Sequence, residues 1–192
     1  MALQECASGG GGLPVFWRFA QARLVNVFSF ACRDLARTIS PSCDGYAVRP
    51  FSAADSNRVA DLVASTAAAS GAGGPAPRPS GLLAELQSRP GRGVSCWLAW
   101  RDSADANGAA APCGLVTLVH ALDRTGRPRW SIGWLIVHPT VRRQGLGRGL
   151  VAFAVRQARV AGAEAVRAET SASWPAAAFW QAVGFTMERS DG

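Results

Sequence analysis

A strand, a glycine-rich turn and a helix follow one another between residues 130 and 161, and this unit constrains the fold more than any other part of the chain. The apolar run Trp130–Val137 predicts a buried strand, and leucines and alanines recur at helical spacing from Gly145 to Ala161. A second strand is predicted at 165–170. Strands joined by a helix in this way lie parallel, so the chain must contain a sheet that is at least partly parallel.

The rest of the sequence predicts strands that pair mainly in antiparallel fashion. Turn-rich stretches at 102–112 and 123–128 separate three consecutive strand candidates, which favours a meander. Strands are predicted at 46–51, 94–101, 113–122 and 185–189, and helices at 57–69, 81–89 and 174–183. We therefore expect an α/β (α+β) fold with a mixed, mostly antiparallel sheet of six to seven strands flanked by helices.

The N-terminal residues 1–44 differ in pattern from the rest of the chain. Consecutive glycines at 9–12 form a hinge, and after them apolar residues recur at helical spacing. These residues are Trp17, Ala20, Leu24, Val27, Phe28, Ala31 and Leu35. We therefore expect an N-terminal extension, 1–44, with an amphipathic helix, and one domain, 45–192. The helix is interpreted as packed on the domain or on a second subunit. A membrane-surface or partner-binding helix and a cleaved presequence stay open.

The chain contains no lysine among its 192 residues, so its 20 basic side chains are all arginine. This excludes a phosphate-binding P-loop lysine, Schiff-base and pyridoxal chemistry, and the strand lysine of protein kinases. In a sequence rich in alanine and glycine, an arginine-only excess is typical of GC-rich codons. We therefore expect no nucleic-acid partner, although the chain is basic.

The histidines and cysteines form no metal-binding pattern, so no metal is expected. Five irregularly spaced cysteines are typical of reduced thiols rather than of a disulfide framework. No apolar run reaches the roughly 18 residues of a membrane span, and the first residues do not resemble a secretory signal. We expect a cytoplasmic protein without a membrane span.

The turn Arg142-Arg143-Gln144-Gly145-Leu146-Gly147-Arg148 has the features of a phosphate cradle. Its glycines let an anion approach the backbone, and the first amides of the following helix have no partner within that helix. A dinucleotide site shares the order of strand, glycines and helix. Here, however, residues 138–144 intervene before the first glycine, and too little chain remains after it for the further β-α units of that fold. The sequence therefore predicts a phosphate site of another kind.

These residues carry a resemblance to a known family. Val137-His138-Pro139 followed by Arg142-x-x-Gly145-x-Gly147 is similar to the acetyl-CoA-binding motif of the GNAT N-acetyltransferase superfamily. Downstream, 173–185 resembles the family's closing helix with its Gly-Phe ending, and 46–50 resembles its opening strand. The resemblance covers residues 45–192. It implies a GNAT-like acyl-CoA N-acyltransferase fold, in which two strands splay apart around the pantetheine arm of acetyl-CoA.

The resemblance also implies which residues bind acetyl-CoA. Backbone groups at the strand end would hydrogen-bond the pantetheine and polarise the thioester carbonyl, and amides of the turn would hold the pyrophosphate. A serine stands where the family often has an asparagine near the cofactor. The implied residues are Leu135, Ile136, Val137, Arg142, Arg143, Gln144, Gly145, Leu146, Gly147, Arg148 and Ser173. Arg142 either contacts phosphate or braces the loop.

The implied function is an acetyl-CoA-dependent N-acetyltransferase that moves the acetyl group to a primary amine by direct attack in a ternary complex. The acceptor would be a small molecule or a peptide. The sequence departs from the family at two catalytic positions, because Ser131 replaces a glutamate and Trp180 a tyrosine, and an indole N–H is not an acid. Glu169, near the end of the second parallel strand, is the candidate catalytic base.

Several alternatives stay open. Glu169 can instead be solvated or paired with an arginine such as Arg167, and His138 is interpreted as a loop-capping residue. Trp130 and Trp134, four apart on one strand, are expected on one face, in the core or along an acceptor cleft. A non-catalytic acyl-CoA-binding or regulatory module is the alternative function, because both family residues are absent. A nucleic-acid-binding module is third. A homodimer is compatible with the sequence.

Overall fold

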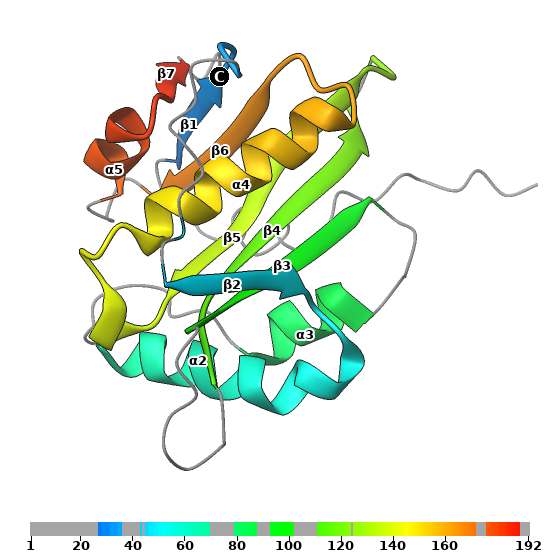
Figure 1. The fold of residues 1–192 in the computed structure, drawn as a ribbon. Helices are drawn as coiled ribbons and strands as arrows, with labels where there is room; N and C mark the ends of the chain where they lie inside the picture. The colour runs from blue at the N-terminus through cyan, green and yellow to red at the C-terminus, as the bar shows by residue number, and fades with distance from the viewer. Residues whose placement is uncertain are drawn as a thin grey trace, which may run out of the picture.

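The computed structural model describes residues 27–35, 43, 45–69, 79–87, 93–101, 111–123, 125–171 and 176–188. Within them, a seven-stranded sheet runs in the order β2-β3-β4-β5-β6-β1-β7 (Figure 1). The strands are β1 (Val27–Cys32), β2 (Tyr46–Pro50), β3 (Val94–Arg101), β4 (Pro112–Leu122), β5 (Pro128–Val137), β6 (Val166–Ser171) and β7 (Thr186–Glu188). β2 to β5 form an antiparallel meander, and β5 and β6 are parallel. The expected mixed, mostly antiparallel sheet is confirmed.

Helices cover both faces of the sheet (Figure 1). The longer ones are α2 (Ser56–Ala69), α3 (Pro79–Gln87), α4 (Leu146–Val160) and α5 (Ala177–Ala182), and the short 3-10 helices are η1 (Ala53–Asp55) and η2 (Pro139–Val141). One core cluster lies between the sheet and α4 and α5, and a second lies between the sheet and α2 and α3. We call these two sides the α4 face and the α2 face. Among the described helices, none has the length and hydropathy needed to cross a membrane.

The helix α4 forms where the sequence placed it, because its apolar residues recur every four positions. Leu146, Leu150 and Ala154 are at most 2% exposed and belong to the core of the α4 face. Arg148, Arg156 and Arg159 lie on the exposed side of the helix. Burial of this stripe fixes α4 against β4 and β5, and so fixes the position of the turn that precedes it.

A buried carboxylate stabilises the 3-10 helix η1, which leads directly into α2. The Asp55 side chain is 3% exposed, accepts hydrogen bonds from both the backbone and the hydroxyl of Ser52, and forms a two-point ion pair with Arg49. Burial by itself raises the pKa of Asp55, but the hydrogen bonds from Arg49 and Ser52 outweigh it and hold the pKa below its usual value. The Arg49 guanidinium also lies 4.1 Å from the ring centroid of Trp100.

The expectation of a helix is wrong for residues 27–32, which form β1. This strand lies between β6 and β7 and is antiparallel to both. Phe30 and Ala31 are both buried, so the strand is covered on its two faces. A strand buried on both faces has a continuous apolar run, and such a run also satisfies a helical pattern. The sheet therefore takes one strand from the segment expected to be an extension. Residues 1–26, 36–42 and 44 lie outside the described part.

Candidate functional site: the turn between β5 and α4

The turn between β5 and α4 has an open, left-handed backbone. Arg143 and Gly145 have φ values of 65° and 87°. Gly145 is the N-cap of α4, and a Cβ added there would meet nothing within 4 Å. A glycine at this position allows the left-handed turn without strain, and it leaves space beside the backbone.

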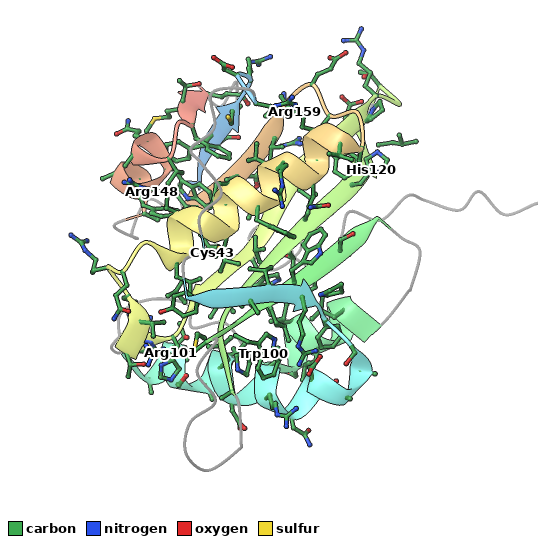
Figure 2. The ribbon with its side chains drawn as sticks, in the orientation of Figure 1. Cys43, Trp100, Arg101, His120, Arg148 and Arg159 are labelled. Carbon is green, nitrogen blue, oxygen red and sulfur yellow. The ribbon has the colours of Figure 1, made fainter. Side chains whose placement is uncertain are left out.

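The first turn of α4 presents unpaired amides. The first helical hydrogen bond runs from the Gly149 N–H to the Gly145 carbonyl at 3.0 Å. The amides of Leu146, Gly147 and Arg148 precede that bond and therefore have no partner within the helix. The Leu146 side chain is buried and anchors the turn, whereas the Arg148 side chain is exposed (Figure 2). Donors at the positive end of a helix dipole, beside an arginine, favour the binding of an anion.

Gly147 has a different role from Gly145. A Cβ added at Gly147 would lie 3.5 Å from Val137 and 3.7 Å from the ring of Phe179 on α5. These are ordinary van der Waals distances, so Gly147 faces β5 and α5 with room for a small side chain. Of the two glycines in the motif, Gly145 faces open space and Gly147 faces protein.

Two exposed side chains of the turn hydrogen-bond to backbone carbonyls and brace it. The Arg142 Nε donates to the Val137 carbonyl at 3.2 Å, and the Gln144 amide donates to the Thr140 carbonyl at 3.3 Å. Arg142 is thus the brace of the loop, one of the two roles expected for it. The hydroxyl of Tyr46, the one tyrosine of the chain, donates to Gln144 Oε1 at 3.4 Å. Sequence reasoning missed Tyr46, because β2 is far from the turn in the sequence.

His138 caps the short helix that opens the turn. Its Nδ1 accepts a hydrogen bond from the Thr140 N–H and lies 2.8 Å from the Thr140 hydroxyl. The interpretation of His138 as a loop-capping residue is confirmed. His120 stacks on Trp130 with ring centroids 4.3 Å apart. In Figure 2 it lies toward the Arg159 end of α4, the end opposite the turn.

The strands β5 and β6 separate before they reach the turn. Their pairing is limited to Trp130–Ile132 with Val166–Ala168. We call the divergence of the two strands beyond Ile132 the splay. In this region the Trp134 N–H donates to Thr117 on β4, and the His138 N–H donates to the Cys113 carbonyl, also on β4.

The alternation along β5 decides which way the backbone groups of its three predicted residues face. Ile136 is in phase with Trp134 and His138, so its backbone groups face β4. The backbone groups of Leu135 and Val137 face the side that β6 has left. Because the Val137 carbonyl already accepts from Arg142, the groups left for a ligand are those of Leu135 and the Val137 N–H.

The expectation that Trp130 and Trp134 share one face is wrong. Trp130 packs against the core of the α4 face, and Trp134 packs against the core of the α2 face. The cause is an irregularity in the β4–β5 ladder. Val116 pairs with Leu135 and Leu118 pairs with Ile132, so β5 carries one residue more than β4 across this step. The extra residue of such a β-bulge reverses the alternation of side chains.

The candidate base Glu169 lies one residue beyond the last β5–β6 pair, at the splay. Its side chain is 18% exposed, and Oε1 accepts from the Arg129 guanidinium at 3.0 Å. Burial raises the pKa of Glu169, against the opposing charges of Arg129 and Arg167. The partner is thus Arg129 rather than Arg167, which donates to Glu188 at 3.2 Å. Sequence reasoning missed Arg129.

Two further residues that the sequence singled out are Trp180 and Ser173. Trp180 is 6% exposed, and its ring packs against Phe179 and Phe185 in the core. Ser173 falls outside the described residues. In the described ranges, no group of three or more His, Cys, Asp or Glu side chains is placed to hold a metal ion.

The structure therefore brings the predicted backbone residues together at one end of the sheet. The turn residues 142–148 follow the end of β5, and Glu169 lies one residue beyond the last β5–β6 pair, at the splay. Thr117 and Gly133, which shape β5 at the splay, were not predicted. A glycine inside the apolar run of β5 was the available signal, because such a glycine often marks a bulge.

Comparison with known proteins agrees with this geometry. A model of the acetyltransferase (GNAT) family matches residues 68–185. No curated protein matches the chain. Among solved structures, an acetyltransferase of Trypanosoma brucei is 19% identical, over 77% of this chain and 96% of that chain, with a TM-score of 0.56.

Two further solved structures are similar. One is AAC(6')-Iy in complex with the bisubstrate analogue CoA-S-monomethyl-acetylneamine, 17% identical over 76% of this chain and 95% of that chain, with a TM-score of 0.58. The other is a GCN5-related N-acetyltransferase from Kribbella flavida, 16% identical over 85% of this chain and 55% of that chain, with a TM-score of 0.55. At these identities the likeness shows the fold alone. Because the family model spans more than half of the chain and includes the whole β5–turn–α4 unit, the chain belongs to the acetyltransferase (GNAT) family.

Proposed function

We propose that this protein is an acetyl-CoA-dependent N-acetyltransferase that acts on a primary amine of a small molecule or peptide. One observation carries the proposal. The free first-turn amides of α4 lie next to the part of β5 whose backbone β6 does not use. An anion site beside an unpaired strand suits an elongated ligand with a pyrophosphate at one end and amide groups along its arm.

The residues at this end of the sheet fit acetyl-CoA. The amides of Leu146, Gly147 and Arg148 would hold the pyrophosphate, and the open space beside Gly145 would admit it. The backbone groups of Leu135 would pair with the amides of the pantetheine arm. Acetyl-CoA, when bound, supplies the activated acetyl thioester.

Glu169 would take the proton of the acceptor amine. An amine with a pKa near 10 is protonated at pH 7, and its deprotonation costs about 4 kcal/mol. Burial raises the pKa of Glu169 and makes it a better proton acceptor than an exposed carboxylate. In the proposed reaction the protonated amine first gives one proton to Glu169, the neutral nitrogen bonds to the acetyl carbon, and the carbon–sulfur bond breaks. The second proton leaves the new amide nitrogen for solvent. The leaving thiolate takes its proton from solvent.

A second function, a non-catalytic acyl-CoA-binding or regulatory module, is favoured by two contacts. The Glu169 carboxylate is engaged by Arg129, and the Trp180 indole that replaces a tyrosine is packed in the core. Such a protein would keep the binding turn and lack turnover.

Calorimetry with acetyl-CoA, combined with a thiol-release assay over a panel of small amines and peptide amines, separates the two functions. Binding together with acceptor-dependent thiol release supports the enzyme. Binding without release for every acceptor favours the module. Absence of acetyl-CoA binding contradicts both.

A further inference from the structure

The bulge in β5 is held by a side chain of the neighbouring strand. At 2.7 Å, the Trp134 N–H donates to the hydroxyl of Thr117, where a regular antiparallel ladder would offer a backbone carbonyl. Thr117 is 0% exposed and lies opposite the step between Leu135 and Ile132, where β5 carries its extra residue. The hydroxyl of Thr117 therefore gives the Trp134 amide a side-chain acceptor at the bulge.

Gly133 is the residue that lets the Thr117 hydroxyl reach this position. A Cβ added at Gly133 would lie 2.9 Å from Thr117 Oγ1 and 3.1 Å from Val119. The first distance is shorter than a Cβ contact allows, and both neighbours sit in a packed ladder. Gly133 and Thr117 can therefore lie this close across the two strands because Gly133 has no side chain.

The bulge coincides with the splay. The last residue of β5 that pairs with β6 is Ile132, and Gly133 comes directly after it. Two changes in β5 therefore occur within one step of the chain. The strand leaves β6, and its side-chain alternation reverses. A β-bulge increases local twist and bends the strand that carries it, which accounts for both.

We infer that Thr117 is a positioning residue, whose hydroxyl holds the bulge through the Trp134 amide and so aims the Leu135 backbone at the splay. Leu135 is the next residue after Trp134, and strand alternation turns its N–H away from β4. The Leu135 N–H is the group proposed to bind acetyl-CoA, so this part of the inference rests on the proposed function.

The role of the Thr117 hydroxyl in stabilising the bulge is tested by amide hydrogen exchange, measured by NMR. Thr117→Val keeps the shape of the side chain and removes the acceptor, and Thr117→Ser keeps the acceptor. Exchange at Trp134, normalised to the Val155 amide in α4, should be about tenfold faster in Thr117→Val and within about twofold of wild type in Thr117→Ser. The matched control is Thr170→Val, because Thr170 is also buried and its hydroxyl has no hydrogen-bond partner in the described residues. That control should leave Trp134 exchange unchanged.

The effect on the ligand is tested by calorimetry with acetyl-CoA. Affinity should fall about tenfold in Thr117→Val and recover to within about twofold of wild type in Thr117→Ser. Unchanged Trp134 exchange in Thr117→Val overturns the inference, whatever the affinity shows. Faster exchange with unchanged affinity overturns the positioning role. If wild-type protein does not bind acetyl-CoA, the proposed function and the positioning role both fail, and the exchange result still decides whether Thr117 holds the bulge.

Discussion

Replacing Phe30 with alanine tests whether residues 27–32 belong to the sheet. Phe30 is 0% exposed, and its strand neighbours are Ala168 on β6 and Met187 on β7. Truncation of a buried phenylalanine removes its transfer free energy and leaves a cavity, at a cost of about 3 to 5 kcal/mol. A domain of this size has a free energy of unfolding of roughly 5 to 15 kcal/mol, so the loss is a large share of the total.

The measurement is urea denaturation followed by tryptophan fluorescence. With a slope of about 2 kcal/mol per molar urea, a loss of about 4 kcal/mol lowers the midpoint by about 2 M. Val160→Ala, at a residue 81% exposed on α4, is the control and should change the unfolding free energy by less than about 0.5 kcal/mol. If Phe30→Ala does not fold, Phe30→Leu should fold with a loss of about 1 kcal/mol.

A midpoint for Phe30→Ala equal to that of the Val160→Ala control would refute the reasoning, because β1 could then not be a buried strand. A chain that begins at residue 45 gives a second readout. Without β1, the edges of β6 and β7 are unpaired, and open edges of this kind lead to aggregation. We therefore expect the shortened chain to be insoluble or unfolded, and a soluble, cooperatively folding product would contradict the role of β1.

Three further predictions concern charge. Gly145→Asp should bind acetyl-CoA about 10- to 100-fold more weakly than Gly145→Asn. Both side chains tolerate a left-handed backbone, and only aspartate adds a negative charge at the turn. Equal affinities in calorimetry would show that the pyrophosphate does not bind at this turn. Arg129→Gln should raise the pKa of Glu169 further, and it should move the acidic limb of the kcat/KM profile to higher pH because the base must be ionised. Glu169→Gln should abolish that limb. If the limb does not move in Arg129→Gln, Glu169 is not the base. Asp55→Asn should cost about 1 kcal/mol at neutral pH, after a discount for screening at the exposed side of Arg49. Because the folded-state pKa of Asp55 is lowered, its contribution is present above the unfolded value near 3.8 and is lost as pH falls through the folded value, so denaturation curves of wild type and variant should converge in acid.

Local patterns predicted most of the fold beyond residue 45. The stripe on α4 repeats every four residues and the strands of the meander end at turn residues, so each element could be located from nearby residues alone. The turn at 142–148 could also be predicted from its own residues. A left-handed N-cap needs glycine, and a helix start leaves amides free whatever surrounds it.

Periodicity failed where a residue's surroundings come from distant parts of the chain. Residues 27–32 satisfied a helical pattern, but two strands more than 130 residues away in the sequence make them a strand. Trp130 and Trp134 obey the two-residue period only in a regular strand, and the hydroxyl of Thr117 on another strand stabilises the bulge that separates them. The apolar periodicity of each segment contains neither effect, although Gly133 inside β5 is a local signal of the bulge.

The sequence by itself determined the turn between β5 and α4, because backbone conformation at a glycine and free amides at a helix start are local properties. The tertiary structure alone decided where β5 leaves β6, which arginine accompanies Glu169, and which segment completes the sheet. Those outcomes depend on contacts between residues far apart in the chain, such as Arg129 with Glu169, 40 positions away. Contacts of that kind form only when the strands pair, so they cannot be predicted from any single stretch of sequence.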